Sequence, residues 1–369
     1  MSVATVEVSL SALTHNVERF RQIAPKSKVA AIVKANAYGH GILPVVKHLA
    51  DKADYIGVAR VSEALAVRDN GYQGNLLVLG GFFPRDDVQL IVDYNLDIVI
   101  HTPEQIARLC SLRYQQPVQV WFKLDTGMHR LGFNVEEAKH YFMQLAACDS
   151  VKKPINVMSH FCCADNLEAD ITPEQIQHFT TFLNSIEDKS LIGLTSLAAS
   201  AGTLAWPEAH FDMVRTGVAL YGVSPFSFKD ENRKTGQMLG LKPAMTFKSE
   251  LIAVRQHQKG ESVGYGHIWQ SPEDTTLGVV AMGYGDGYPR GIAEGTPVLI
   301  NGQRYPIVGR VAMDMIVVDL GPDSTLQSGN EVIFWGKDLP VEEIAHHSGF
   351  SPYELITRLT PRVKTRYVK

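Results

Sequence analysis

The sequence has little excess charge of either sign and no long hydrophobic run. Its 369 residues carry 35 Lys and Arg against 39 Asp and Glu, which leaves a net charge of −4. The strong basic field with which a protein holds nucleic acid is therefore missing, and we expect no nucleic-acid partner. No apolar run approaches the ~18 residues that a membrane helix needs, so we expect no membrane partner either.

The chain is also poor in cysteine and lacks a recognisable targeting segment. The four cysteines show no CxxC or metal-ligand spacing: Cys110, Cys148, Cys162 and Cys163. The N-terminus has neither the basic stretch nor the apolar stretch of a signal peptide. We therefore expect reduced thiols, no metal site and a cytoplasmic protein.

The first 220 or so residues alternate short β-branched runs with helix-period stretches, among them 61–70 and 85–94. With 45% hydrophobic residues, the chain is long enough for two domains with cores of their own. The alternation predicts eight strands, followed by helices, which is typical of a TIM-type (β/α)8 barrel. An open doubly wound sheet is the alternative, because periodicity does not show closure. The expected strands are 28–33, 55–59, 75–80, 97–101, 118–123, 155–160, 194–198 and 212–215.

Two helix starts are marked by the same tetrapeptide, Thr-Pro-Glu-Gln, at Thr102–Gln105 and Thr172–Gln175. In each, the threonine is suited to the N-cap, the proline to the first helical position, and the acid to the positive end of the helix dipole. We expect one helix to begin directly after Thr102 and another directly after Thr172.

The pattern changes after about residue 223, where a polar stretch at 229–236 is typical of a linker between domains. Asn301-Gly302 predicts a two-residue hairpin, since both positions must accept positive φ. We expect a barrel domain at 1–228 and a mainly β domain at 229–369, with one helix at 341–347. The strands expected in the second domain are 245–254, 277–282, 297–300, 305–308, 316–319 and 331–335.

Ionisable and polar residues gather where the expected barrel strands end, which is where TIM barrels carry their catalytic groups. They are Lys34, Lys123, His160, Ser200 and Arg215. Lys34 closes an apolar strand, so burial would lower its pKa and suit it to a Schiff base. A lysine that only extends from the barrel rim into solvent fits this segment as well.

The segment from Arg215 to Val218, together with Ser200–Gly202, matches the phosphate site that many barrels build after their last two strands. A lysine beside a phosphate site suggests pyridoxal phosphate. A sugar-phosphate aldolase that uses a Schiff-base lysine fits these two features equally.

Five segments, in order along nearly the whole chain, resemble the alanine racemase family. The segment 33–41, Val-Lys-Ala-Asn-Ala-Tyr-Gly-His-Gly, is similar to the family's pyridoxal-phosphate attachment site. The other four are Lys123–Gly132, Val214–Gly222, Met282–Arg290 and Val308–Asp314. The resemblance implies a racemase that interconverts L- and D-alanine, either to supply D-alanine for peptidoglycan or to break it down.

The resemblance implies two catalytic groups on opposite faces of the substrate. Lys34 would hold the cofactor and act on the D-side, and Tyr265 would act on the L-side from the other subunit of a head-to-tail homodimer. Two groups are needed because one rigid group does not easily reach both faces. His160 and Arg215 resemble the hydrogen-bonded pair that supports the phenolate, and Arg215 would face the pyridine nitrogen.

The remaining roles also come from the resemblance. Arg130 would bind the substrate carboxylate, and Met313 and Asp314 would approach it from the partner subunit. Lys123 resembles a lysine that many relatives carbamylate, although an ordinary salt-bridged lysine is the alternative. Ala199 and Thr216 depart from the family's usual asparagine and proline, so we expect one polar contact to be absent or replaced and the loop before Gly217 to be less constrained. The phosphate ligands would be Tyr38, Ser200, Gly217, Val218 and Tyr353.

Three other classes of protein remain as alternatives. A broad-specificity amino-acid racemase and an amino-acid decarboxylase of the same fold type would use the same cofactor. A pyridoxal-phosphate carrier or regulatory protein could be built on the barrel alone. The second domain and Tyr265 argue against the carrier.

Overall fold

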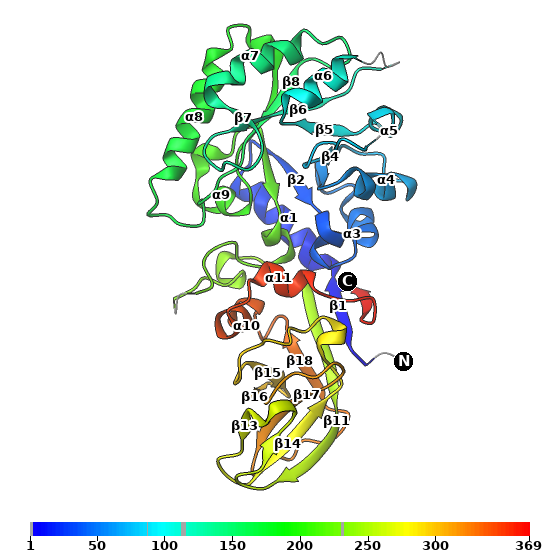
Figure 1. Ribbon diagram of the computed structural model, residues 1–369, viewed down its shortest axis with the longest axis vertical. Coiled ribbons are helices and arrows are strands. Elements are labelled where there is room, and N and C mark those ends of the chain that lie inside the picture. The colour runs from blue at the N-terminus through cyan, green and yellow to red at the C-terminus, as the bar shows by residue number, and fades with distance from the viewer. Residues whose placement is uncertain (1–2, 87, 112–115, 230–231) are drawn as a thin grey trace. The chain divides into compact units, whose positions relative to one another are not determined.

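The computed structural model describes residues 3–86, 88–111, 116–229 and 232–369, which divide into two compact units (Figure 1). The barrel unit contains residues 16–37 and 42–220, and the β unit contains the described residues of 1–15, 38–41 and 221–369. The division expected at 228/229 therefore lies at 220/221. Two N-terminal segments, 3–15 and 38–41, also group with the C-terminal part of the chain.

The barrel unit is built on a parallel sheet whose eight principal strands follow the expected order. Its neighbours run β10-β2-β3-β4-β5-β6-β8-β9. The sheet closes because Ala199 and Arg215 form a parallel bridge between the last two strands, where Arg215 N donates to Ala198 O at 3.0 Å. The open-sheet alternative is thus wrong. The strands are β2 (Lys28–Ile32), β3 (Tyr55–Val58), β4 (Leu76–Val78), β5 (Asp97–Ile100), β6 (Val120–Asp125), β8 (Ile155–Met158), β9 (Ile192–Ser196) and β10 (Met213–Thr216), with β7 (Phe133–Asn134) beside β6.

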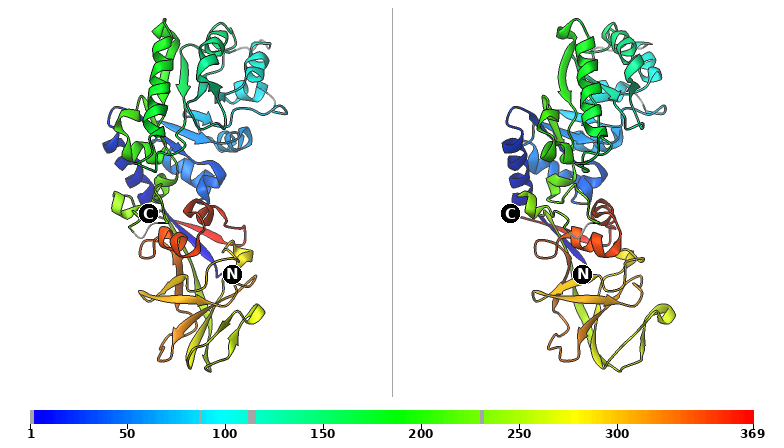
Figure 2. Two further views of the ribbon diagram at one scale, coloured as in Figure 1. Left: turned by 60° about the vertical axis from the view of Figure 1, so that its left-hand side comes forward. Right: turned by 90° about the vertical axis from the view of Figure 1, so that its left-hand side faces the viewer.

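Helices cover the outside of this sheet, as expected for strands that are apolar on both faces. Helices α6, α7 and α8 lie side by side there (Figure 2). Part of the expected 85–94 helix is observed as α5, and residue 87 lies outside the described part of the chain. The helices up to the end of the barrel are α1 (Leu10–Ile23), α2 (Lys34–Tyr38), α3 (Ile42–Leu49), α4 (Val61–Asp69), α5 (Val88–Asp93), α6 (Pro103–Ser111), α7 (Val135–Ala146), α8 (Ile171–Ser185) and α9 (Ser200–Ala205).

The two Thr-Pro-Glu-Gln signals have different outcomes. Helix α6 begins at Pro103, and the Thr102 hydroxyl accepts a hydrogen bond from Gln105 N at 3.3 Å, which confirms the first prediction. The second is wrong, because α8 begins at Ile171 and Thr172 lies inside its first turn. Thr172 and Gln175 are fully buried, so packing rather than capping explains their identity.

The β unit has an antiparallel core extended by one parallel strand at its edge. The order is β14-β17-β16-β15-β18-β11-β1-β19, and β14 also pairs with β11, so six strands close on themselves. All six predicted strands are observed. The strands are β1 (Thr5–Ser9), β11 (Met245–His257), β14 (Thr275–Val280), β15 (Pro297–Ile300), β16 (Gln303–Val308), β17 (Ile316–Gly321), β18 (Glu331–Trp335) and β19 (Lys364–Val368), with a separate ribbon of β12 (Ser262–Val263) and β13 (Trp269–Gln270).

The predicted hairpin of this unit is confirmed, and so is the helix at 341–347, although a second helix follows that was not predicted. Asn301 and Gly302 have φ of 49° and 80° between β15 and β16, which is the backbone of a type I′ turn. The remaining helices are α10 (Val341–Ser348) and α11 (Pro352–Thr357), with short 3₁₀ turns η1 (Lys189–Leu191), η2 (Pro207–Ala209), η3 (Val218–Tyr221), η4 (Gln237–Leu239), η5 (Tyr265–His267) and η6 (Tyr284–Asp286). No helix in the described ranges is long and apolar enough to cross a membrane.

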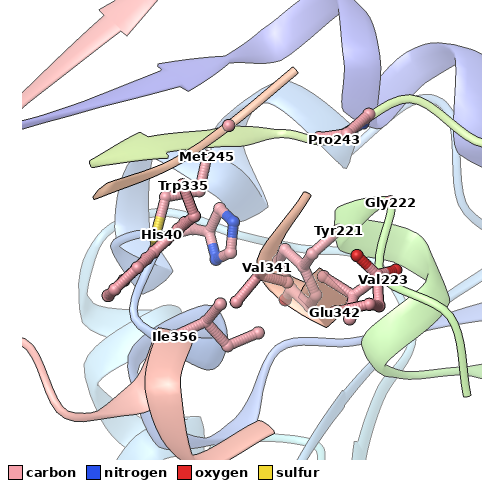
Figure 3. Close-up of a pocket in the computed structure, with 11 residues that line it drawn as sticks. His40, Tyr221, Gly222, Val223, Pro243, Met245, Trp335, Val341, Glu342 and Ile356 are labelled. Atoms are coloured by element: carbon pink, nitrogen blue, oxygen red, sulfur yellow. Dashed lines mark hydrogen bonds between the residues drawn. The ribbon is translucent and has the colours of Figure 1, made fainter. Parts of the chain in front are cut away.

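The expected linker at 229–236 is tied to helix α10 by one buried carboxylate, although residues 230 and 231 lie outside the described part. Glu342 Oε1 accepts hydrogen bonds from Ser224 N at 2.7 Å and Gly236 N at 2.9 Å. Glu342 lines a small cavity of the β unit together with His40, Tyr221 and nonpolar side chains (Figure 3). Burial raises the pKa of Glu342 above its ordinary value.

The next carboxylate in the chain has the opposite environment. Glu343 forms an ion pair with Arg304, whose Nε lies 2.7 Å from Glu343 Oε1. The hydrogen bond from Arg304 lowers the pKa of Glu343. A raised pKa destabilises the folded state as the pH rises above the unfolded value of about 4.3, whereas a lowered pKa stabilises it as the pH rises toward that value from below.

Separate substitutions E342Q and E343Q should therefore change the pH dependence of stability in opposite directions. From acid to neutral pH, E342Q is expected to gain stability relative to the unsubstituted chain, and E343Q is expected to lose it. Thermal unfolding at a series of pH values measures both, and the two variants serve as each other's control. Relative stabilities that move in the same direction would contradict this interpretation.

Candidate functional site

Lys34 lies two residues beyond the end of β2, at the start of a left-handed turn. Ala35, Asn36, Ala37 and Tyr38 have φ between 50° and 55°, and none of them is glycine. Such a conformation costs about 1–2 kcal/mol for each ordinary L-residue, so the surrounding contacts must hold it. One such contact is the Asn36 side chain, whose Oδ1 accepts a hydrogen bond from Ile42 N at 2.9 Å.

The Lys34 amine is partly buried among charged groups. Burial lowers its pKa, the nearby Arg130 lowers it further, and Glu63 acts in the opposite direction. A larger fraction of Lys34 is therefore neutral at a given pH than for a lysine in water. A neutral amine is the form that attacks a carbonyl or takes up a proton.

Arg215, on β10, is buried without an acidic partner in the described part of the chain. Its guanidinium donates to Ser196 Oγ at 2.5 Å, to Ser159 O at 2.6 Å and to Leu197 O at 3.1 Å. It also lies 3.3 Å from His160 Nδ1. Burial alone lowers the pKa of Arg215 to about 10, so the group remains charged at neutral pH.

The contact with Arg215 determines the tautomer of His160. A guanidinium only donates, so Nδ1 of His160 is the acceptor and the ring proton is on Nε2. Burial and the cations Arg215, Lys123, Arg130 and Lys34 hold the pKa of His160 well below its usual range. His160 is therefore neutral and presents an N–H donor.

A buried polar network that the sequence analysis missed supports this pair. Gln175 Nε2 donates to His160 O at 3.2 Å and to Thr126 Oγ1 at 3.2 Å, and Thr126 Oγ1 lies 2.8 Å from Ser159 Oγ. Gln175 belongs to the second Thr-Pro-Glu-Gln segment. The sequence analysis assigned this segment only to a helix start, whereas the structure shows Gln175 in a buried hydrogen-bond network. Nothing in the local sequence marks Thr126 and Ser159 as partners.

Lys123 and Arg130 lie on β6 and in the turn that follows it. Asp125 Oδ1 organises this turn by accepting hydrogen bonds from the amides of residues 127, 128 and 129 at 3.0–3.1 Å. Burial, followed by Arg215 and Arg130, lowers the pKa of Lys123 to about 8. Lys34, Lys123, Arg130, His160 and Arg215 thus form one neighbourhood with a surplus of cationic groups.

Ser200 and the loop after β10 form the candidate phosphate site. Ser200 Oγ accepts hydrogen bonds from Gly217 N at 3.0 Å and Ala219 N at 3.4 Å. Both acceptor positions of the hydroxyl are then used, and its proton can be donated to an anion. The loop amide of Gly217 is directed at Ser200, while Val218 begins η3.

The two departures from the family pattern have visible consequences in the strands. Thr216 Oγ1 donates to Ala30 O at 3.3 Å, so the threonine ties β10 to β2 instead of loosening the segment before Gly217. The Ala199 backbone bridges to Arg215, and its carbonyl accepts hydrogen bonds from the amide and the hydroxyl of Thr203. The methyl side chain of Ala199 has no polar atom, so it cannot make the contact that an asparagine side chain would make at this position.

In the β unit, Tyr38 and Tyr353 lie close together. Their ring centroids are 6.4 Å apart, and Tyr38 lies 5.0 Å from the ring of Tyr221. Tyr38 is buried and Tyr353, on α11, is 40% exposed. Burial raises the pKa of Tyr38, so its hydroxyl remains a donor.

Tyr265, Met313 and Asp314 are presented at the surface of the β unit. Tyr265 is 70% exposed in η5, and Met313 is 52% exposed. Asp314 Oδ1 lies 2.8 Å from Arg362 Nη2, and Arg362 Nε lies 3.4 Å from the buried Asp286. Arg362 is a further residue that the sequence analysis missed, because its partners lie far away in the sequence.

The chemistry of the barrel unit's donor set fits an anionic aldehyde cofactor. Three groups occur at the ends of adjoining strands: an amine of lowered pKa, a serine hydroxyl with its proton to donate, and a buried guanidinium that has no carboxylate partner among the described residues. A bound phosphate would balance the cationic surplus. The arrangement can hold such a group covalently at Lys34 and move protons nearby.

Comparison with known proteins points to one family. The family model of the alanine racemase N-terminal domain matches residues 8–225, and that of the C-terminal domain matches residues 244–367. The chain is 51% identical to the biosynthetic alanine racemase of Escherichia coli (strain K12) over 368 residues, which is 100% of both chains.

Solved structures agree with this assignment over the entire chain. Biosynthetic alanine racemase from Pseudomonas aeruginosa is 39% identical with a TM-score of 0.94, and 100% of both chains is covered. Alanine racemase from Bartonella henselae with covalently bound pyridoxal phosphate is 25% identical with a TM-score of 0.89, again over 100% of both chains. Since both domain models and full-length relatives match, the chain belongs to the alanine racemase family.

Proposed function

We propose that this enzyme interconverts L- and D-alanine with pyridoxal phosphate held at Lys34, as the family assignment and the cationic barrel site together support. The observation that carries the proposal is the contact between Arg215 and the neutral His160, beside an amine of lowered pKa. The biosynthetic name of the relative from Escherichia coli supports a role in supplying D-alanine.

The residues of the barrel unit match the parts of the cofactor. Lys34 would bind the aldehyde carbon, Ser200 and the Gly217–Val218 loop would bind the phosphate, and Arg215 would face the pyridine nitrogen. By the family resemblance, Tyr38 and Tyr353, which belong to the β unit, are further candidates for phosphate ligands. When bound, pyridoxal phosphate withdraws electrons from the substrate's α-carbon and so makes its proton removable.

Lys34 and Tyr265 would exchange protons with opposite faces of the α-carbon. The lowered pKa of Lys34 provides a neutral amine that can accept a proton on the D-side. Tyr265 needs help because an ordinary phenol, with a pKa near ~10, is a poor base. The Nε2 proton of His160, whose Nδ1 faces Arg215, can be donated to the Tyr265 oxygen and would stabilise its charge.

Arg215 would keep the pyridine nitrogen unprotonated, because a guanidinium has no proton acceptor and remains charged. The electron withdrawal by the ring is then limited. Reprotonation at the α-carbon is favoured over transamination or decarboxylation. The buried neutral contacts of Arg215 with Ser159, Ser196 and Leu197 hold the guanidinium in place.

We infer a head-to-tail homodimer as the active form. Tyr265 is too exposed in a single chain to work in a site from which water is excluded, and the neighbouring Ile268 and Met313 are about half exposed as well. A partner that covers them would bring Tyr265, Met313 and Asp314 to the other subunit's site. The bulk of Tyr265 and Tyr353 would then limit the substrate to a small side chain.

Arg130 would bind the substrate carboxylate, and Lys123 would orient Arg130 as a carbamate. The pKa of about 8 at Lys123 provides the neutral amine that reacts with carbon dioxide, and the surrounding cations favour the resulting anion. Native mass spectrometry that finds no labile carbon dioxide adduct at Lys123 would leave an ordinary lysine as the explanation.

The proposed reaction is tested by the circular dichroism of L-alanine, L-serine and L-lysine solutions, each incubated with the purified protein and pyridoxal phosphate. We expect the alanine signal to decay to zero fastest, with no loss of amino acid. Retained alanine together with racemised or consumed lysine would contradict the substrate assignment and favour a broad racemase or a decarboxylase.

Tyr265→Phe should separate the two faces of the reaction. In deuterated water it is expected to exchange the α-proton of D-alanine through Lys34 while racemisation falls by about 10²–10⁴-fold. Nuclear magnetic resonance measures the exchange. Equal exchange of both enantiomers would contradict the assignment of Tyr265 to the L-side.

Mixing Tyr265→Phe with Lys34→Ala tests the origin of the tyrosine. If Tyr265 acts in the partner's site, random exchange of subunits creates heterodimers with one intact site and restores about a quarter of the full activity. The unmixed variants are the controls. Activity that stays at their level after verified subunit exchange would place Tyr265 in its own chain's site.

Arg215→Glu should change the products rather than only the rate, because a carboxylic acid can protonate the pyridine nitrogen. We expect pyruvate and the aminated cofactor to accumulate faster per racemisation event. Chromatography and absorbance quantify both, and Arg215→Lys, which keeps the charge, is the matched control. An unchanged ratio of products would contradict the proposed role.

A further inference from the structure

Glu63 is a carboxylate near Lys34 to which neither the sequence analysis nor the family assignment gave a role. It lies in the first turn of α4, and its two oxygens have different partners. Oε2 accepts hydrogen bonds from Ala59 N at 2.8 Å and Arg60 N at 3.2 Å, where the chain enters the helix. Oε1 accepts a hydrogen bond from Ala35 N at 2.8 Å.

The bond to Ala35 acts directly on the segment that carries Lys34. Ala35 is the next residue in the chain and the first with positive φ in the left-handed turn, at 53°. Holding its N–H fixes the peptide plane between Lys34 and Ala35, and with it the direction in which the lysine side chain leaves the backbone. One carboxylate therefore ties the end of β2 to the start of α4.

Glu63 also balances charge around the lysine. The groups that act on the Lys34 amine are Arg130 and Glu63, with Lys123 and His160 in the same neighbourhood. Arg130 and burial favour the neutral amine, whereas Glu63 favours the charged one. The protonation of Lys34 thus depends on the negative charge of Glu63 as well as on the burial of the lysine amine.

We propose that Glu63 is a positioning residue for Lys34, which holds the peptide that follows the lysine and supplies the negative charge that keeps its amine protonatable. Racemisation needs both states of Lys34, since the amine takes a proton in one direction and returns one in the other. The catalytic part of this proposal rests on the proposed function. The part that concerns the peptide between Lys34 and Ala35 does not.

No other side chain can do both tasks at this position. A glutamine has one acceptor oxygen, so its NH₂ group would face either Ala35 N–H or the amides of Ala59 and Arg60. An aspartate keeps the charge but is one methylene shorter and cannot span from α4 to Ala35. Glu63→Gln therefore tests the role of the negative charge, and Glu63→Asp tests the role of the side-chain length.

The test uses the full-length chain freed of cofactor and an amine-acylating reagent, with the Lys34 peptide quantified by mass spectrometry across pH. The midpoint of labelling reports the protonation of Lys34 without any turnover. Glu63→Gln is expected to lower this midpoint by about one pH unit, because an opposite charge has been removed. Glu174→Gln, an exposed first-turn acid on α8, is the matched control and should leave it unchanged.

Glu63→Asp tests the geometric half of the proposal. It should keep the labelling midpoint near that of the unsubstituted chain, while kcat for alanine racemisation falls by about tenfold with the amine misplaced. Thermal unfolding establishes that each variant is folded. If Glu63→Gln does not fold, the kcat of Glu63→Asp decides.

Two results would overturn the proposal. A folded Glu63→Gln whose labelling midpoint matches that of Glu174→Gln would remove the charge argument, and a kcat of Glu63→Asp equal to that of the unsubstituted chain would remove the positioning argument. If the unsubstituted chain does not racemise alanine, the proposed function fails. The labelling results would still test the effect of Glu63 on the protonation of Lys34, because they do not depend on turnover.

Discussion

The hydrogen bonds around Arg215 are the interactions on which the barrel site depends. Arg215 N donates to Ala198 O where the sheet closes, and its guanidinium reaches Ser159 O and Leu197 O at the ends of two other strands. Three strand ends are thereby held by one side chain. Without this closure, Arg215 on β10 and Ser200, which follows β9, would lie at opposite edges of an open sheet.

The Arg215 guanidinium is a buried charge that has no acidic partner in the described part of the chain. Desolvation opposes a buried guanidinium, and each hydrogen-bond acceptor around Arg215 in the described chain is neutral. Burial, and after it the neighbouring cations, lower the pKa of Lys34, Lys123 and His160 together. An anionic ligand would supply a counter-charge to this whole cluster of groups.

Parts of the fold and of the site could be predicted because their sequence signals are local. Lys34 follows an apolar strand, Asn301-Gly302 forms a turn that needs positive φ, and both domains carry segments that resemble one family in order. The partners of these residues were not predictable. Gln175 was visible only as part of a helix start, and Glu63 only as a member of the helix-period stretch 61–70. The burial of Gln175 against Thr126 arises from strands and helices far apart in the sequence.

The sequence by itself determined the βα alternation, the change to short alternating strands after residue 223, and the identity of the reactive groups, because each depends on periodicity or on residue type. The tertiary structure alone decided that the sheet closes, that β1 and β19 join the β unit, and that His160 presents its Nε2 proton. These outcomes depend on hydrogen bonds between segments that are distant in the chain. Local pattern carries no information about such pairings, because any strand edge or carbonyl could in principle have served as the partner.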